Sequence, residues 1–267
     1  MISTTTATEH QVVSREEWLA ARKAHLENEK RLTRLRDQLS AERRALPWVK
    51  IEKDYTFEGP DGPVTLAELF NGRSQLIINH FMFGPEWEVG CIGCSFKADH
   101  LDGALYHLPH RDVSLVTVSR APLPKIAAYK ARMEWTFPWV SSYGSDFNSD
   151  FLVSYTSDDR AAGRPWHINF EERAAPEGDA EESGISVFFK DAQGDIFHTY
   201  SSFIRGDEAM LTTYSLLDLT PIGRNETHGL AEWVHPHDRY NTAGHVDMST
   251  GEWISDANTA NSDCGCH

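Results

Sequence analysis

The hydrophobic and polar positions at the start of the chain have the periodicity of a helix. Between residues 14 and 46 the charges are mixed, and leucines recur at helical spacing: Leu32, Leu35, Leu39 and Leu46. Ser14 and Glu17 have the spacing of a capping box, in which each side chain can satisfy the other residue's free backbone amide. The pattern predicts one long helix that Pro47 ends. Its leucine stripe packs either on its own domain or on another subunit.

After this helix the pattern changes to short apolar runs separated by segments with helical periodicity. Residues 76–83 and 113–120 predict buried strands, and residues 137–143 predict a shorter one. A strand–turn–strand pattern follows at 184–203, and a closing helix or ordered loop is expected at 207–221. The order βαβαβ followed by a hairpin is typical of an α/β fold with a mixed, mostly parallel sheet flanked by helices.

Three parts of the chain are expected from these patterns. Residues 1–48 form an N-terminal tail and the long helix, residues 49–220 form the α/β domain, and residues 221–267 form a C-terminal extension. Inside the domain, the stretch "EERAAPEGDAEESG" at 171–184 predicts an acidic surface loop or linker.

Composition narrows the choice of partners and compartment. The 267 residues are 40% hydrophobic and 11% aromatic, enough to build a core. A formal net charge of -15 repels phosphate backbones and anionic lipid, so we expect neither nucleic acid nor a membrane as partner. No apolar run reaches the roughly 20 residues of a membrane span, and the N-terminus lacks the features of a secretory signal. We therefore expect a cytoplasmic protein, in which cysteines are more often catalytic or metal-binding than disulfide-bonded.

The stretch "FMFGPEWEVGCIGCSFKADH" carries the main chemical signal. Cys91 lies between a predicted strand and a predicted helix, and Cys94 follows nearly one helical turn later. Free backbone amides and the positive end of the helix dipole would favour a thiolate at Cys91. Cys91 could then attack a disulfide, and Cys94 could resolve the mixed disulfide. The pair is therefore a candidate catalytic dithiol, with metal ligation and inert packing as alternatives.

Neighbouring residues suggest how this site is built. Gly90 would allow unusual dihedral angles at a sharp turn, and Gly93 would remove bulk beside the sulfurs. Trp87 would either shield the site or anchor the loop. The carboxylates Glu86, Glu88 and Asp99 would oppose the thiolate and raise the pKa of Cys91.

Two further groups of residues could bind metal. Cys264, Cys266 and His267 end the chain and could hold copper or zinc, relay electrons to Cys91 and Cys94, or form an exposed tail. His235, His237 and His245 lie close in sequence, but structural hydrogen bonding is the simpler interpretation. His100 and His107 are seven residues apart and are expected to serve in packing or at the surface.

Long segments of the chain resemble a known family. "FMFGPEWEVGCIGCSFKADHLDGALYHL", "RDVSLVTVSRAPLPKIAAYKARMEWTFPWVSSYGSDFNSDF" and "LLDLTPIGRNE" with "WVHPHDRY" are similar to bacterial thioredoxin-like proteins of unknown function, which are predicted dithiol-disulfide oxidoreductases. The resemblance runs from about Glu16 to Tyr240. It implies a thioredoxin-like fold with peroxiredoxin-like features, since "FPWVSS" is similar to the start of a strand in peroxiredoxins.

Two departures from the related folds qualify the resemblance. Thioredoxins carry a cis-proline facing the cysteine pair, and Ser186 is expected at that position here, which would open the site to metal. Peroxiredoxins have a Thr and a Pro before the reactive cysteine, whereas Glu88, Val89 and Gly90 precede Cys91. Efficient peroxide chemistry is therefore not expected.

The sequence thus predicts a thiol-disulfide oxidoreductase that needs no cofactor and acts on a small thiol or a protein disulfide through Cys91 and Cys94. The alternative is a copper or zinc protein that uses the same cysteines with histidines or with the C-terminal cysteines. A homo-oligomer formed through the N-terminal helix is a further expectation.

Overall fold

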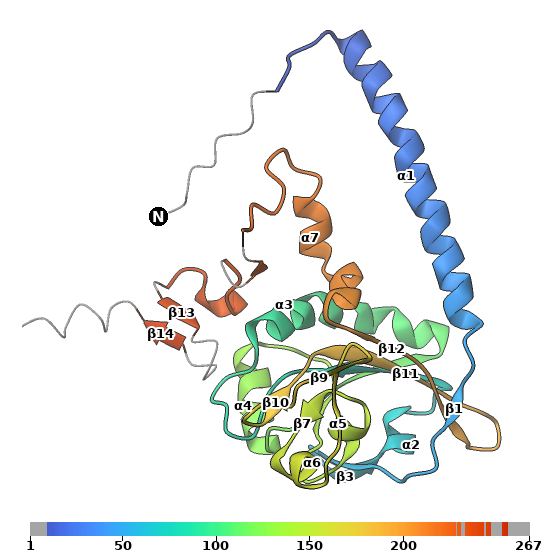
Figure 1. Cartoon of the computed structure of the whole chain (residues 1–267), viewed down its shortest axis with the longest axis vertical. Coiled ribbons are helices and arrows are strands. Elements are labelled where there is room, and N and C mark those ends of the chain that lie inside the picture. Colours follow the sequence, from blue (N-terminus) through green and yellow to red (C-terminus); the bar gives the residue numbers. More distant parts are fainter. Residues whose placement is uncertain (1–9, 228, 231–232, 243, 247–252, 256–267) are drawn as a thin grey trace, which may run out of the picture.

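A mixed β-sheet with helices packed on it forms the body of the molecule (Figure 1). The structure, a computed structural model, describes residues 10–227, 229–230, 233–242, 244–246 and 253–255. Its largest sheet has eight strands in the order β1-β12-β11-β4-β5-β6-β2-β3. None of the helices in these ranges is long and apolar enough to cross a bilayer.

The centre of the sheet combines a parallel and an antiparallel half. Strand β4 (Gln75–His80) pairs in parallel with β5 (Val113–Ser119), which pairs in parallel with β6 (Trp139–Ser141). On its other side, β4 pairs antiparallel with β11 (Gly184–Lys190), and β11 pairs antiparallel with β12 (Ile196–Phe203). The two buried runs and the hairpin predicted from the sequence are therefore confirmed.

Shorter strands complete the sheet and add three small ribbons. At one edge β1 (Val49–Lys50) pairs with β12, and at the other β2 (Thr56–Gly59) and β3 (Gly62–Thr65) extend the sheet beyond β6. The small ribbons consist of β7 (Ser154–Tyr155) with β10 (Ala180–Glu181), β8 (Trp166–Ile168) with β9 (Glu171–Arg173), and β13 (Gly244–Val246) with β14 (Trp253–Ser255).

Two helices connect the parallel strands. Helix α3 (Ile92–Leu101) follows β4, and α4 (Leu123–Arg132) follows β5. This βαβαβ unit followed by the β11–β12 hairpin confirms the predicted α/β, thioredoxin-like fold class. The shorter α-helices are α2 (Leu66–Leu69), α5 (Phe147–Asp150), α6 (Ser157–Ala161) and α7 (Thr212–Leu217), and the 3-10 helices are η1 (Asp102–Tyr106), η2 (Leu108–Arg111), η3 (Ile204–Met210) and η5 (His237–Arg239).

Apolar side chains gather on both faces of the sheet. On one face lies a cluster around Phe147, Phe151 and Phe188. On the other face, α3 and α4 pack over an aromatic cluster that includes Phe81, Tyr129, Trp135 and Trp139. Rings in this second cluster meet edge-to-face or tilted, as between Phe81 and Trp139 at 4.6 Å, which is the geometry that aromatic pairs prefer. This aromatic layer supports the end of β4 from which the cysteine loop leaves.

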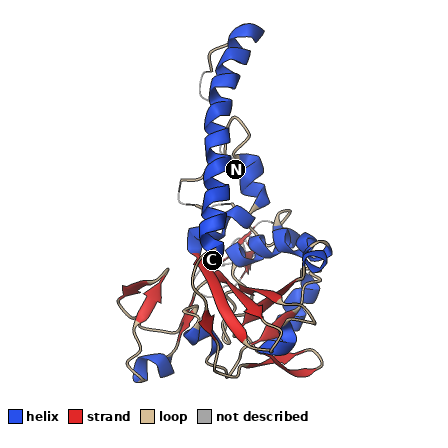
Figure 2. Cartoon of the chain, turned by 90° about the vertical axis from the view of Figure 1, so that its right-hand side faces the viewer, coloured by secondary structure: helices blue, strands red, loops and turns tan. Residues whose placement is uncertain are grey.

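Helix α1 (Arg15–Arg44) stands clear of the body in both views (Figures 1 and 2). Ser14 and Glu17 form the predicted capping box, with Ser14 N–H donating to Glu17 Oε2 at 2.9 Å. No residue of the helix is buried, and the four stripe leucines are 46–49% exposed. The predicted helix is confirmed, and within the described residues its leucine stripe does not pack on its own domain.

The acidic segment 171–184 is not the loop that was predicted, because it contains β9, β10 and the first residue of β11. Glu171, Glu172 and Arg173 are exposed, as expected of a surface segment. Glu181, by contrast, is buried. Its carboxylate accepts a hydrogen bond from Arg120 Nε at 2.6 Å and one from Ser154 Oγ at 2.6 Å, and these bonds compensate the loss of water. The prediction of a surface loop is therefore wrong for Glu181, whose charge is compensated by a buried guanidinium that the local sequence does not reveal.

Replacing Phe188 by alanine tests the packing of the first cluster. Phe188 is fully buried against Phe147 and Phe151, so Phe188→Ala is expected to lower the free energy of unfolding by about 3–5 kcal/mol. Its neighbour Phe189 points to the other face and is only partly buried, so Phe189→Ala should cost less than about 2 kcal/mol. Urea unfolding of both variants measures the difference. Equal losses would contradict this account of the core.

Candidate functional site

Cys91 begins helix α3, as predicted. It is the N-cap residue, and its carbonyl accepts a hydrogen bond from Ser95 N–H at 2.9 Å. Its own N–H donates to Met82 O at 3.0 Å, which ties the start of the helix to the chain leaving β4. Cys94 lies three residues further along the same helix. The local sequence therefore places both sulfurs at the end of α3 where backbone amides are free.

A close approach of the chain at Gly90 sets this geometry. A Cβ atom at position 90 would lie 2.5 Å from Phe81 Cε1 and 2.9 Å from Tyr129 Cε1, closer than real Cβ contacts. Gly90 does not have a positive φ, so the predicted need for unusual dihedral angles is wrong. The glycine is required because an aromatic pair leaves no room for a side chain. At Gly93 a Cβ would make only ordinary contacts, 3.9 Å from Cys91 Sγ.

The two thiols differ in environment. Cys91 is half-buried, Cys94 is buried, and neither is in a disulfide. A hydrogen bond from the Cys94 side chain, together with the backbone amides of Cys94 and Gly93, lowers the pKa of Cys91 to about 7 against the opposing effect of burial. The same hydrogen bond, burial and the nearby Cys91 charge raise the pKa of Cys94 well above its usual value. Met82 N–H also points to Cys94 Sγ at 3.4 Å.

The charge that acts on the thiols is a buried lysine. Lys97 Nζ lies 2.7 Å from Asp207 Oδ2, with side chains only 4% and 7% exposed, and its positive charge lowers the pKa of both cysteines. The predicted rise in the Cys91 pKa from nearby carboxylates is therefore wrong. Glu88 pairs instead with Lys125, and Asp99 accepts hydrogen bonds from Trp135 and His237.

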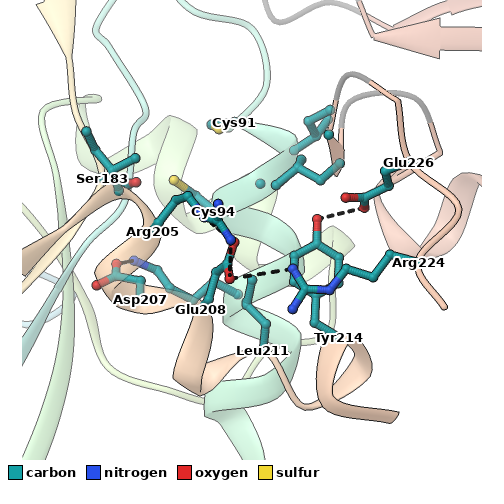
Figure 3. Close-up of a pocket in the computed structure, with 16 residues that line it drawn as sticks. Cys91, Cys94, Ser183, Arg205, Asp207, Glu208, Leu211, Tyr214, Arg224 and Glu226 are labelled. Carbon is teal, nitrogen blue, oxygen red and sulfur yellow. Dashed lines mark hydrogen bonds and ion pairs between the residues drawn. The ribbon is translucent and has the colours of Figure 1, made fainter. Parts of the chain in front are cut away.

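A cavity of about 490 Å³ opens beside the two cysteines (Figure 3). The first turn of α3 forms one side of it, with Cys91, Cys94 and Lys97. The chain that follows β12 forms the opposite side, with Arg205, Glu208, Leu211, Tyr214, Arg224 and Glu226. Trp87, for which shielding of the site was one interpretation, instead packs over Gly84 and is not among the residues that line the cavity.

Ser183, rather than Ser186, faces the cysteines across the cavity. Ser183 immediately precedes β11 and lines the cavity (Figure 3). Ser186 lies inside β11, fully buried, where its hydroxyl is hydrogen-bonded to His80 Nε2 and to Ser201 Oγ, both at 2.8 Å. The prediction that Ser186 faces the cysteine pair is therefore wrong. The strand begins at Gly184, as its apolar run predicted, so position 186 lies inside the strand and away from the cavity.

Two of the histidines make hydrogen bonds within the fold. His237 Nδ1 is hydrogen-bonded to Asp99 at 2.8 Å, and His100 bridges Phe96 O and Thr213. Within the ranges that the structure describes, no three His, Cys, Asp or Glu side chains come together as metal ligands. Cys264, Cys266 and His267 lie outside the described residues, so the metal, relay and tail interpretations of that segment stay predictions.

Sequence reasoning missed the ion pair and the far wall of the cavity. Lys97 could have been found, because it follows Cys94 by one helical turn and so shares its face of the helix. Asp207 and the wall residues carry no local signal, since they are more than 100 residues away in sequence and reach α3 only through the fold.

A comparison of the whole sequence with protein-family models matches residues 7–240 to the family described as bacterial protein of unknown function (DUF899). The chain belongs to this family. No curated protein sequence matches it significantly. The family description assigns no activity, so the chemistry must be argued from the site itself.

Solved structures similar to the chain include redox proteins at low identity. Peroxidoxin BcpB from Mycobacterium tuberculosis is 15% identical, with a TM-score of 0.40 over 63% of this chain and 95% of that chain. Peroxiredoxin Q from Xanthomonas campestris is 13% identical, with a TM-score of 0.37 over 59% and 88%. A candidate protein disulfide isomerase from Bacteroides thetaiotaomicron is 18% identical, with a TM-score of 0.35 over 64% and 91%.

The environment of Cys91 predicts its reactivity as a function of pH. Alkylation of Cys91 should have its half-point near pH 7, because only the thiolate reacts and the pKa of this cysteine is lowered to about 7. Cys94→Ala removes the largest stabilising hydrogen bond and should raise the half-point most. The double variant Lys97→Met with Asp207→Asn removes the buried charges together and should raise it less.

A second buried ion pair provides the control. Arg120 and Glu181 are also buried and paired but do not contribute to the pKa of Cys91, so Arg120→Met with Glu181→Gln should leave the half-point unchanged. Rates of iodoacetamide labelling at Cys91, followed by mass spectrometry from pH 5 to pH 9, measure all four proteins. A half-point near that of a free cysteine in the wild type would refute the assignment.

Proposed function

We propose that this protein is a thiol-disulfide oxidoreductase in which Cys91 is the nucleophile and Cys94 the resolving thiol. The observation that carries the proposal is the position of both free thiols at the N-terminus of α3 beside the cavity. This environment lowers the pKa of Cys91 and raises that of Cys94. A thiolate attacks disulfides and a thiol does not, so the more exposed sulfur is also the reactive one.

In the first step the Cys91 thiolate attacks one sulfur of a substrate disulfide. A bond forms between Cys91 Sγ and that sulfur, the substrate S–S bond breaks, and the other half leaves as a thiolate that takes a proton from solvent. The enzyme then carries a mixed disulfide at Cys91. Cavity space beside Cys91 supports this step, because the substrate must approach along the S–S axis.

In the second step Cys94 resolves the mixed disulfide. Its thiol gives up a proton, its sulfur bonds to Cys91 Sγ, and the second substrate half leaves and takes the proton. Two electrons have then passed from the cysteine pair to the substrate, which has become two thiols. An external dithiol or low-mass thiol must reduce the Cys91–Cys94 disulfide again.

The electrostatics of the pair favour this order of events. In the reduced protein, the hydrogen bond to Cys91 and the charge of Cys91 help to hold the proton on Cys94. Formation of the mixed disulfide removes that charge, while the positive charge of Lys97 remains. The pKa of Cys94 therefore falls at the step in which Cys94 must become a nucleophile.

Cysteine variants test the proposal. All proteins carry Cys264→Ser and Cys266→Ser, so that Cys91 and Cys94 are the remaining cysteines. Treatment of the reduced protein with 2-hydroxyethyl disulfide should lower its mass by about 2 Da, the loss of two hydrogens on disulfide formation. Cys94→Ser should instead accumulate a mixed disulfide at Cys91, and Cys91→Ser should form no adduct at neutral pH.

Intact-mass measurements and the release of mercaptoethanol distinguish the outcomes. A Cys91→Ser protein that still consumes the disulfide, or a reduced parent protein that never loses two hydrogens, would refute the proposed roles.

A further inference from the structure

The far wall of the cavity is a segment packed onto the outer face of α3. Phe96 of α3 forms a buried cluster with Leu211, Tyr214 and Val234. The Phe96 ring meets the Tyr214 ring edge-to-face at 5.7 Å, and Thr213 is hydrogen-bonded to His100 of α3. The helix that carries the cysteines is therefore covered, and a substrate must enter between α3 and this wall.

The charged side chains of the wall are already paired with one another. Arg224 forms two hydrogen bonds with Asp218, both at 2.9 Å, and its guanidinium lies 3.9 Å from the centre of the Tyr214 ring. Arg205 pairs with Glu208 through two hydrogen bonds. Arg224 is therefore a poor site for an anionic substrate, because binding one would compete with an existing ion pair, whereas the Arg205 pair is exposed to solvent.

Apolar groups remain for the substrate. Ile92, Leu211 and Leu230 line the cavity beside the cysteines. Asp207 also lines it, but its Oδ2 pairs with Lys97 and its Oδ1 is a buried atom with no hydrogen-bond partner among the described residues. The carboxylate therefore presents no accessible acceptor to the substrate.

Backbone strain at the edge of the cavity also indicates that this edge contacts the substrate. Ile204 has a φ of +53°, a left-handed conformation that is unfavourable for a β-branched residue, and its side chain is 45% exposed. Such strain tends to occur at functional sites. At Ile204 the strained backbone presents an apolar side chain at the edge of the cavity.

We propose that the substrate is a compact, uncharged disulfide with apolar groups on both sides. The inference rests on the proposed function, because it specifies the disulfide that Cys91 attacks. A cavity of about 490 Å³ is in the size range that holds a small organic molecule or a few residues of a peptide. A folded protein disulfide and a charged tripeptide disulfide fit this wall poorly.

Three disulfides test this selectivity. The amide probe is cystamine acylated on both nitrogens with phenylacetyl groups, which is neutral and apolar, while glutathione disulfide is anionic and insulin is a folded protein. The amide probe should exceed glutathione disulfide and insulin in kcat/KM by about tenfold or more.

Two matched variants separate recognition from folding. Ile204→Asn keeps a residue that tolerates a left-handed backbone, so it should preserve stability while raising KM for the amide probe about fivefold or more. Leu219 is 81% exposed and does not line the cavity, so Leu219→Asn should change neither value. Equal kcat/KM for glutathione disulfide and the amide probe would overturn this inference alone. Failure to reduce even 2-hydroxyethyl disulfide would refute the proposed function itself.

A separate observation concerns the free-standing helix α1. Trp18, Leu32, Leu35 and Leu39 are 47–49% exposed, and the three leucines lie within about 60° of one another around the helix. Leu32 and Leu39 are seven residues apart, and Trp18 lies two further intervals of seven before Leu32. A seven-residue spacing of apolar residues is typical of helices that pair in coiled coils.

Charge along α1 favours a second copy of the same helix as its partner. Residues 15–29 carry three basic and four acidic side chains, whereas residues 30–44 carry six basic and two acidic ones. In an antiparallel pair, the basic half of each helix lies beside the slightly acidic half of the other. In a parallel pair, the two basic halves would repel each other.

We infer that two copies of this chain associate through α1 in antiparallel orientation. Leu39→Glu places a carboxylate in the stripe and should convert a dimer to a monomer at 20 µM, measured by light scattering during size-exclusion chromatography. Ala41→Glu adds the same charge on the opposite face and should leave the dimer intact. A wild-type monomer at 100 µM, or equal effects of the two variants, would overturn the inference and leave α1 to another partner.

Discussion

The site depends on the contact of Gly90 with Phe81 and Tyr129. There the chain passes so close to two aromatic rings that no side chain would fit, and the rings are held in a buried aromatic cluster with Trp135 and Trp139. The entry of α3 is therefore fixed by rigid groups rather than by a mobile loop. Because Cys91 is the next residue, its sulfur lies at the free amides of the helix, which is the condition for a stable thiolate.

Helix α3 then uses its other faces to complete the site. Phe96 packs against the segment that forms the far wall of the cavity. Lys97 places a buried cation near both sulfurs and forms an ion pair with Asp207. A buried ion pair gives little net stability unless its geometry is good, and breaking one member is costly. The Lys97–Asp207 pair is therefore better understood through its effect on the two thiols and on the cavity than as a source of fold stability.

Sequence patterns were sufficient for the elements and insufficient for their long-range contacts. The apolar runs and the capping box of α1 are local, so strands β4, β5, β11 and β12 and that helix were predicted correctly. Ser186 was placed wrongly because the serine that lines the cavity lies in the loop before β11, where no local pattern marks it. Asp207 was missed because only the fold brings it to Lys97. The helix N-terminus correctly predicted a lowered pKa at Cys91, whereas the opposing effect expected of the carboxylates was wrong because nearby sequence is not nearby charge.

The two surfaces inferred from the structure are joined through the backbone of the sheet. Helix α1 leads into β1, β1 pairs with β12 through Val49 and His198, and β12 ends immediately before the strained Ile204 at the cavity. Arg43 of α1 also lies over the Tyr200 ring of β12 at 4.7 Å. This continuity alone does not make the two surfaces influence each other. Energetic coupling requires an element with two conformations, and both sites must shift the equilibrium between them. On this path Ile204 is the residue whose backbone is strained in the conformation described, so relief of that strain would favour a change at this residue rather than in the paired strands.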